Sequence, residues 1–274
     1  MQAVRWEQQP IDFWREAWRA GAVHYFDTVT STNDVAAELA ADGAPHFTVV
    51  IAEEQTRGRG RGGSAWRSVR GRSLLFSVLI RVGEPGPTPG CAPIRAGVAV
   101  AAAIEACTRV AVCVKWPNDV VFSQHGKVAG VLCEGTLDQS AAGHIVIGIG
   151  VNVLQSRSDF DAELRGSACS VLSASNVRVA RADLMNAIIE RLQAFDRMIT
   201  MPLSDAELWR IAELDLLFNR KVTCETDKRS ITGVARGIAR DGALRLELPG
   251  GLIHVYNATV RLADTRAYPG STRG

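Results

Sequence analysis

Residues 53–66 read Glu-Glu-Gln-Thr-Arg-Gly-Arg-Gly-Arg-Gly-Gly-Ser-Ala-Trp, and this stretch carries three arginines and four glycines between two apolar segments. Glycine lets a backbone adopt positive φ and approach a ligand closely, while arginine supplies charge and forked donors that suit phosphate or carboxylate. Trp66 adds a flat aromatic face. The composition of this Arg/Gly loop therefore indicates a segment that binds an anion.

Three interpretations of the Arg/Gly loop compete. Gly58, Gly60 and Gly63 satisfy the dinucleotide fingerprint G-x-G-x-x-G after an expected strand, but that fingerprint needs a helix at the glycines, and residues 64–72 show no helical apolar period. A second interpretation is an Arg/Gly segment that binds RNA, although such segments usually repeat and this one occurs once. The third is a phosphate-closing loop of an adenylating enzyme, and the rest of the chain decides between them.

Composition excludes several classes of protein. The chain has 274 residues, 47% of them hydrophobic, which allows one large domain and a small one, and its net charge of +2 makes the basic loop a local feature. It has no apolar run of about 18 residues and no apolar signal region near the N-terminus. Its six cysteines and five histidines lack paired spacing, which predicts free thiols and no structural metal. We expect a cytoplasmic protein that is not a membrane protein.

Apolar periodicity predicts the order of the secondary-structure elements. Helices are expected at 11–19, 35–41, 94–109, 181–200 and 205–214. Strands are expected at 23–29, 47–52, 73–81, 110–116, 120–122, 127–134 and 144–153. Five further short strands, at 221–225, 230–238, 243–248, 252–255 and 259–262, predict a small antiparallel barrel at the C-terminus.

Polar residues and glycines gather where these elements begin, end or break. Ser31 or Thr32 is a natural helix cap, and capping alone would explain either residue, although a helix start also presents donors to a ligand. Residues 115–119, Lys-Trp-Pro-Asn-Asp, interrupt a strand, and a plain surface turn does not explain why a lysine, an amide and a carboxylate converge there. Lys127 at a strand start is by default a solvated edge residue.

Five motifs follow one another between residues 31 and 152: Ser31-Thr32-Asn33, Gln55-x-x-Gly58-Arg59-Gly60-Arg61-x4-Trp66, Lys115-Trp116-Pro117-Asn118-Asp119, Lys127-Val-Ala-Gly130 and Gly148-x-Gly150-Val-Asn152. In this order they resemble the motifs of the biotin protein ligases, also called biotin–[acetyl-CoA-carboxylase] ligases. Residues 168–172, Ala-Cys-Ser-Val-Leu, are similar to the family's Ala-Thr-Ser-Leu, so the resemblance extends over nearly the whole chain.

The resemblance implies a fold and a reaction. The expected fold is α+β: a mixed central sheet flanked by helices, of the class II synthetase-like biotin/lipoate ligase type, with a catalytic biotin/ATP domain over 1–215 and an SH3-like β-barrel over 216–274. The expected reaction activates biotin with ATP to biotinyl-5′-AMP and then transfers biotin to one lysine of a carrier domain. A carboxylate is already ionised near neutral pH, so the first step needs charge neutralisation by Arg, Lys and Mg²⁺ rather than a general base.

Matching motifs carry the family's functional residues to this sequence. Those implied to contact biotin are Ser31, Thr32, Asn33, Gln55, Gly58, Arg59, Gly60, Arg61, Lys127 and Gly130. Those implied to contact ATP or the adenylate are Trp66, Lys115, Asn118 and Asn152. The catalytic set is Lys127, Arg59, Arg61 and Asp119, with Asp119 orienting the incoming lysine. No metal ligand from the protein is expected, since Mg²⁺ accompanies ATP.

Departures from the family pattern and two alternatives remain. The basic residue usual before the loop tryptophan is replaced here by Gly63-Ser64-Ala65, and residues 1–22 are too short for a DNA-binding winged helix. We therefore expect the ligase-only type, which acts on the biotin carrier of acetyl-CoA carboxylase or a related carboxylase and does not bind DNA. The alternatives are a lipoate or octanoate ligase or transferase of the same fold and, more distantly, an RNA-binding protein. The sequence leaves open whether the protein forms a homodimer.

Overall fold

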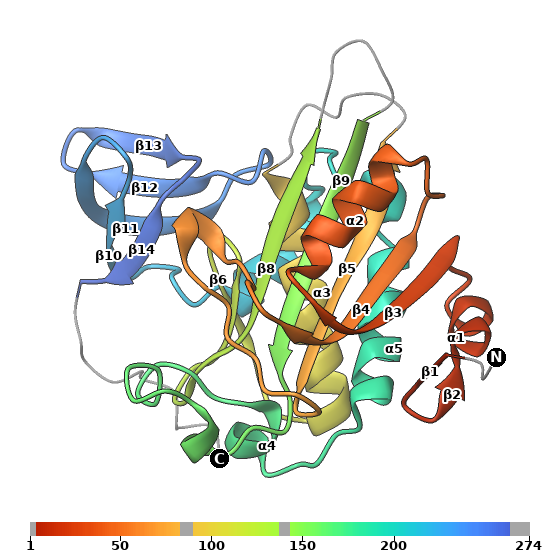
Figure 1. Ribbon diagram of the computed structural model, residues 1–274. Coiled ribbons are helices and arrows are strands. Elements are labelled where there is room, and N and C mark those ends of the chain that lie inside the picture. The colour runs from red at the N-terminus through yellow and green to blue at the C-terminus, as the bar shows by residue number, and fades with distance from the viewer. Residues whose placement is uncertain (1–3, 83–89, 137–142, 264–274) are drawn as a thin grey trace.

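A seven-stranded mixed sheet forms the centre of the protein (Figure 1), for which a computed structural model describes residues 4–82, 90–136 and 143–263. Its strand order is β3-β4-β5-β9-β8-β7-β6. β3 pairs with β4 in parallel, and every other neighbouring pair is antiparallel. The strands are β3 (Ala22–Val29), β4 (Thr48–Gln55), β5 (Ser73–Val82), β6 (Cys113–Lys115), β7 (Asp119–Phe122), β8 (Gly126–Thr136) and β9 (Gly143–Asn152).

Helices cover both faces of this sheet because its central strands are apolar on both sides. The helix α2 (Thr32–Ala41) covers one face, where Ala36 and Ala40 pack against β4, β5 and β9. The helices α3 (Cys91–Thr108) and α5 (Arg181–Gln193) lie together on the other face (Figure 1). Among the described residues, α3 is the one helix long and apolar enough to cross a membrane, and 67% of it is buried inside the molecule, as expected of a core helix.

The N-terminal segment packs through tryptophans. It consists of the two-residue strands β1 (Arg5–Trp6) and β2 (Gln9–Pro10) and the helix α1 (Ile11–Ala17). The rings of Trp6, Trp14 and Trp18 lie within 5.0–6.1 Å of one another, and all three are buried. The sequence predicted the helix, but the small hairpin was not predicted because each of its strands has only two residues.

Five antiparallel strands near the C-terminus form a second sheet of order β13-β12-β11-β10-β14. They are β10 (Lys221–Glu225), β11 (Ser230–Ile238), β12 (Leu244–Leu248), β13 (Gly251–Val255) and β14 (Thr259–Leu262), which confirms the predicted strands. The first and last strands of this order are not paired within the described residues, so the predicted closed barrel is not seen as a ring. This sheet packs on α6 (Asp205–Leu214) and on Trp116 and Ile94 of the first part.

Most predicted element boundaries agree with the structure, and two differ for physical reasons. The predicted strand 110–116 is only three residues long, since residues 109–112 connect α3 to β6 without pairing. The predicted helix 181–200 ends at Gln193 and continues as a separate 3-10 turn, Asp196–Met198, although its apolar spacing runs on to Phe195. The fold also has the short helix α4 (Val171–Ser175) and two other 3-10 turns, Arg61–Gly63 and Arg157–Asp159. No disulfide joins the six cysteines.

Candidate active site

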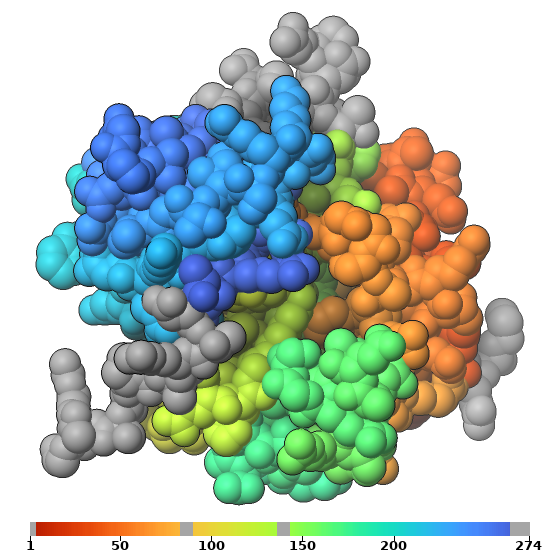
Figure 2. All heavy atoms as spheres, turned by 90° about the vertical axis from the view of Figure 1, so that its left-hand side faces the viewer, coloured from red at the N-terminus to blue at the C-terminus, as the bar shows by residue number. Residues whose placement is uncertain are grey.

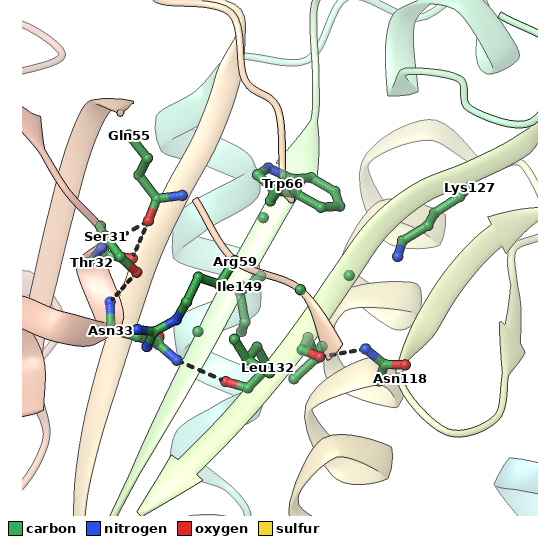
Figure 3. Close-up of a pocket in the computed structure, with 15 residues that line it drawn as sticks. Ser31, Thr32, Asn33, Gln55, Arg59, Trp66, Asn118, Lys127, Leu132 and Ile149 are labelled. Atoms are coloured by element: carbon green, nitrogen blue, oxygen red, sulfur yellow. Dashed lines mark hydrogen bonds between the residues drawn. The ribbon is translucent and has the colours of Figure 1, made fainter. Parts of the chain in front are cut away.

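A pocket of about 430 Å³, part of it open to solvent, lies over the middle of the sheet at the start of α2. Ser31, Thr32, Asn33 and Gln55 form one side of it, and Ser77 is buried behind them; we call these five residues the head region. Ser31 caps α2 by accepting a hydrogen bond from the amide of Asn33 at 3.3 Å, as predicted. Gln55 Oε1 accepts from the Thr32 amide at 2.8 Å and from Thr32 Oγ1 at 3.1 Å (Figure 3).

Ser77 completes the head region from β5. Its Oγ lies 2.7 Å from both Thr32 Oγ1 and Asn33 Oδ1, and its side chain is fully buried. Because a buried polar group is costly unless it is hydrogen-bonded, this network fixes the polar side chains at the helix start in one arrangement. The head region therefore offers a rigid set of neutral donors and acceptors.

The Arg/Gly loop folds as a small irregular hairpin above the pocket. The amide of Trp66 donates to Gly58 O at 2.9 Å, and the amide of Gly60 donates to Ser64 O at 2.7 Å. Gly62 and Gly63 have φ values of 60° and 76°, a left-handed conformation that glycine adopts readily, and they form the turn. The helix that a dinucleotide-binding fold would need is replaced here by one 3-10 turn, Arg61–Gly63.

Trp66 lies against two glycines of the sheet. A Cβ at Gly150 would come within 2.5 Å of the indole ring, and a Cβ at Gly130 within 3.1 Å, so both glycines make room for the ring. Lys127 Nζ lies 5.5 Å from the ring centre, within the range of a cation–π contact. Trp66 Nε1 is buried against the sheet at Gly150 and has no hydrogen-bond partner among the described residues. In Figure 3, Trp66 lies between Gln55 on one side and Lys127 on the other.

A second group of side chains, the cationic region, consists of Lys115, Lys127 and Arg61 around Asp119. Lys127 Nζ lies 2.6 Å from Asp119 Oδ1, and Lys115 pairs with Asp119 across the β6–β7 ladder. Burial lowers the pKa of Lys115, and the charge of Asp119 partly offsets that effect. Burial also lowers the pKa of Arg61, again against the charge of Asp119. One carboxylate thus faces three cations, which leaves this region positive.

Two of the loop arginines have different partners. Arg59 lies between two carboxylates, 2.6 Å from Asp34 Oδ1 and 2.7 Å from Glu134 Oε2, so its charge is balanced. Arg61 contacts only neutral acceptors, Asn257 Oδ1 and the carbonyl of Ala258 at 3.4 Å, and it has no ion pair within the part of the chain described. Arg61 therefore ties the loop to the turn before β14 and keeps an unbalanced charge.

The Arg/Gly loop separates the pocket from two larger hollows. A hollow of about 1500 Å³, including open solvent, lies beyond Trp66 and shares Gln55, Trp66 and Lys127 with the pocket. A third groove runs between the loop and the C-terminal sheet, past Arg61 and Asn257. Figure 2 shows the loop in orange, the segment near residue 160 in green and the C-terminal strands in blue around this side of the molecule. The larger hollow has room for a nucleotide next to the pocket.

The structure brings most of the predicted site residues together. Those that line the pocket are Ser31, Thr32, Asn33, Gln55, Arg59, Gly60, Trp66, Asn118, Lys127 and Gly130. Gly58 and Asn152 line the larger hollow. Three predicted residues lie outside both. Arg61 lines the third groove, and Lys115 lines a small apolar cavity beside Asp215 and Trp116. Asp119 contacts Lys127, which lines the pocket.

Asn118 and Asn152, both predicted to contact ATP or the adenylate, already have hydrogen-bond partners within the protein. Asn118 Nδ2 donates to Val131 O at 2.7 Å, and Asn152 Nδ2 donates to Cys169 O at 3.1 Å. Gln155 Nε2 donates to Asn152 Oδ1 at 3.1 Å. These amides hold the floor of the two hollows, and their contact with a nucleotide stays a prediction.

Several residues that line the pocket or support its side chains were not predicted. Ser77 lies behind the pocket and interrupts the apolar run 74–80 of β5, and that interruption was the available signal. Asp34 and Glu134 balance Arg59, but ion pairs across 25 and 75 positions leave no local pattern. Leu132 and Ile149 supply apolar lining from β8 and β9 and look like any other core residue. Within the described ranges, no group of three or more His, Cys, Asp or Glu side chains is arranged to hold a metal ion.

Known families and proteins are similar to this chain in sequence. The biotin/lipoate A/B protein ligase family matches residues 25–152, and the biotin protein ligase C-terminal domain matches residues 217–260. The bifunctional ligase/repressor BirA of Bacillus spizizenii is 32% identical over 242 residues, which cover 87% of this chain and 73% of that protein. The biotin–[acetyl-CoA-carboxylase] ligase of Paracoccus denitrificans is also 32% identical, over 81% of this chain and 92% of that protein.

A solved structure supports the same assignment at the level of the fold. The biotin protein ligase from Aquifex aeolicus, solved in complex with biotin and ATP, superposes with a TM-score of 0.75 at 24% identity, covering 88% of this chain and 99% of that one. Both matched sequence regions fall on the two sheets described above. The chain belongs to the biotin protein ligase family.

Proposed function

We propose that this enzyme binds the ureido head of biotin in the head region and joins the biotin carboxylate to ATP in the cationic region. The observation that carries this proposal is a pocket with neutral, hydrogen-bonded side chains at one end and the cation Lys127 at the other, while Lys115, Arg61 and Asp119 lie outside its lining. Biotin has the same polarity, a neutral ureido ring and an anionic carboxylate. Such matched placement supports both orientation of the substrate and neutralisation of charge.

The head region suits a ureido group. The carbonyl of that group accepts hydrogen bonds and its two N–H groups donate them, and Ser31, Thr32 and Gln55 offer both kinds of partner. We propose that Asn33, Gly58, Arg59, Gly60 and Gly130 complete this end of the pocket. Asn33 and Arg59 share Glu134, which fixes both side chains.

The cationic region suits the chemistry of adenylation. One carboxylate oxygen of biotin attacks the α-phosphorus of ATP, a new C–O–P linkage forms, and the bond to the β-phosphate breaks as pyrophosphate leaves. We assign Lys127 and Arg61 to neutralising the negative charge that gathers on the phosphate oxygens, with Arg59 at the edge of the same site. The Mg²⁺ expected with ATP would be held by phosphate oxygens, since the described residues form no cage for it.

Transfer to the acceptor is the second step. The amine of a carrier lysine attacks the acyl carbon of biotinyl-5′-AMP, an amide bond forms, and AMP leaves. An exposed lysine has a pKa of about 10.4 and arrives mostly protonated, so a carboxylate near the site helps to steer it and to receive the proton. We assign this role to Asp119, which contacts Lys127. Trp66, Asn118, Asn152 and Lys115 are assigned to the adenylate side.

The acceptor, the location and the domain division are parts of the same proposal. The Paracoccus relative is named for acetyl-CoA carboxylase, and we propose the biotin carrier domain of that enzyme or of a related carboxylase as the acceptor, in the cytoplasm. We propose a catalytic domain over 1–215 and an SH3-like domain over 216–274. We propose no role on DNA for the N-terminal segment described, in which residues 4–21 form a short hairpin and a seven-residue helix. A homodimer stays open.

The test is mass spectrometry of a biotin carrier domain incubated with the protein, biotin and MgATP. Biotin attachment to one lysine, with one pyrophosphate released per transfer, is the expected result. Parallel reactions with lipoate and octanoate decide the substrate, because a dithiolane or alkyl chain has no ureido donors and acceptors to hydrogen-bond with the polar groups of the head region. Adenylation of lipoate without adenylation of biotin would overturn the proposal, and so would salt-sensitive RNA binding with no pyrophosphate release.

A further inference from the structure

The two stems of the Arg/Gly loop are not joined by the sheet itself. The β4–β5 ladder runs from the Thr48–Leu79 pair to the Ala52–Leu75 pair and stops there. Glu53 and the residues after it have no β5 partner, although the parallel ladder with β3 continues to Gln55. The loop that carries Arg59, Arg61 and Trp66 therefore leaves and re-enters the fold at a place where backbone pairing between its stems is missing.

A buried ion pair joins the stems instead. Arg181, the first residue of α5, binds the carboxylate of Glu53 with two parallel hydrogen bonds, Nη1 to Oε2 at 2.8 Å and Nη2 to Oε1 at 2.9 Å. The side chains of both residues are only 11% exposed. This forked geometry is the strongest form of arginine–carboxylate contact, and it is directional.

The same two residues also bind the returning stem. Arg181 Nη1 donates to the backbone carbonyl of Ser73 at 3.1 Å, and Glu53 Oε2 accepts from the backbone amide of Gly71 at 3.2 Å. Arg181 Nε donates to Glu7 at 2.7 Å, which anchors the guanidinium on its other edge. One guanidinium therefore holds the outgoing stem at Glu53 and the incoming stem at Ser73.

Ser73, which Arg181 binds, also hydrogen-bonds to two residues that line the larger hollow. Its Oγ accepts from the amide of Val69 at 2.9 Å, within the loop, and from Gln155 Nε2 at 2.8 Å. On the other stem, Gln55 follows Glu53 by two positions and binds Thr32 in the head region. The stems thus connect Arg181 and Glu53 to the larger hollow through Ser73 and to the head region through Gln55.

We infer that Arg181 is a positioning residue for the proposed ligase reaction, which clamps both stems so that the Arg/Gly loop stays aligned over the adenylate. Arg181 lines none of the hollows of the site, so it acts through Glu53, Gly71 and Ser73 and not by touching substrate. The competing explanation is that the pair only stabilises the fold. The pair of Arg181 and Glu53 makes two backbone contacts on the returning stem, at Ser73 and Gly71. A pair that only stabilised the fold would not need these contacts with the loop stem.

The variants separate loop alignment from fold stability. Arg181→Met removes the clamp and leaves Glu53 buried with few donors, which destabilises the fold as well. Glu53→Leu combined with Arg181→Met removes both charges of the buried pair, and Glu7, whose side chain is 28% exposed, keeps contact with solvent. Replacing a buried pair by apolar residues often restores stability. Arg181→Lys keeps the charge but not the fork. Arg95→Met is the matched control, since Arg95 forms a buried pair with Glu207 between α3 and α6, away from the loop.

Three measurements are made on each full-length variant: the thermal unfolding midpoint, the rate of trypsin cleavage after loop arginines in ligand-free protein, located by mass spectrometry, and the rate of release of preformed biotinyl-5′-AMP. We expect Arg181→Met and the double variant to show about tenfold faster loop cleavage and adenylate release, because small misalignment far from the chemistry has effects of that size or larger. The double variant should unfold near the wild-type midpoint, and Arg181→Lys should lie between. Arg95→Met should unfold earlier without faster loop cleavage.

The positioning role would be overturned if the rates of loop cleavage and adenylate release depended only on the unfolding midpoint in all variants, Arg95→Met included. A well-folded double variant whose loop is as resistant as wild type would also overturn it. The cleavage measurement needs no substrate, so it tests the clamp even when the wild-type protein forms no adenylate. A wild-type protein that forms no adenylate would contradict the proposed function and not the clamp.

Discussion

The head region and the cationic region lie in one site but are held in opposite ways. The head region is built from neutral side chains, buried apart from the partly exposed Gln55, that hydrogen-bond to one another and, through Asn33, to β8. In the cationic region three positive groups, Lys115, Lys127 and Arg61, face one carboxylate, Asp119. The first region is stable without a ligand, whereas the second gains balancing charge when an anion binds. The hydrogen-bond network of the head region is thus in place before binding, whereas the positive charge of the cationic region is neutralised only when an anion binds.

Removal of Lys127 should have the largest effect of any single change in the site. Lys127→Ala removes the cation that touches Asp119 and lies over Trp66, and we expect adenylation to slow by about 100- to 1000-fold, as found when one preorganised transition-state donor is lost. Biotin binding through the head region should change far less. Single-turnover pyrophosphate release and biotin titration measure the two effects separately.

Lys228→Ala, at an exposed turn of the C-terminal sheet, is the matched control and should behave like wild type. An unchanged adenylation rate in Lys127→Ala would remove this lysine from the catalytic residues and would erase the contrast between the two regions.

A methyl group added at Gly148 should damage the head region instead. Its Cβ would lie 2.1 Å from Asn33 Oδ1, so the Asn33 and Ser77 contacts must shift. We expect Gly148→Ala to weaken biotin binding by roughly 10- to 100-fold, the range for losing one or two buried hydrogen bonds, with a smaller loss of single-turnover rate at saturating biotin.

Gly250→Ala is the control, because a Cβ there has no atom within 4 Å and Gly250 lies in a turn of the C-terminal sheet. Isothermal titration with biotin alone measures the effect. Equal affinity for biotin in both glycine variants would show that the head region is not where the ureido ring binds.

The same contrast explains how far the sequence could predict this site. Ser31 and Thr32 were predictable because a helix cap has a local signature, and the glycines at 62 and 63 because a tight turn needs positive φ. The contact of Arg61 with Asn257, 196 positions away, has no local signature and depends on how the second sheet packs. Ser77 was hidden because one serine in an apolar strand is common, and Lys115 lies outside the pocket although its neighbour in the motif, Asn118, lines it.

Arg61→Gly should have a moderate effect, confined to retention of the intermediate. The variant loses an unbalanced charge and the tie to residues 257 and 258, so we expect biotinyl-5′-AMP to leave about tenfold faster while biotin affinity is kept. Adenylate release in wild type should also quicken with salt, since the lost interaction is electrostatic, and the salt dependence should be weaker in Arg61→Gly. Arg236→Gly, an exposed arginine paired with Glu247 on the C-terminal sheet, is the control. Identical release rates and salt dependence in wild type and Arg61→Gly would contradict an electrostatic role for this arginine.

The smallest expected effect is a difference in pH dependence between the regions. Burial lowers the pKa of Lys115, so this lysine loses its proton at a lower pH than an exposed lysine, whose pKa is about 10.4. As pH rises into the alkaline range, Lys115 should lose its positive charge at a lower pH than an exposed lysine would, and the adenylation rate should fall by a few-fold. Biotin affinity should stay level over the same range, because the side chains of the head region do not ionise. Lys115→Arg keeps the charge at high pH and should move the fall in rate to a higher pH. A rate profile of Lys115→Arg that superimposes on that of wild type, with biotin affinity falling in parallel, would place the alkaline loss elsewhere and remove Lys115 from the cationic region.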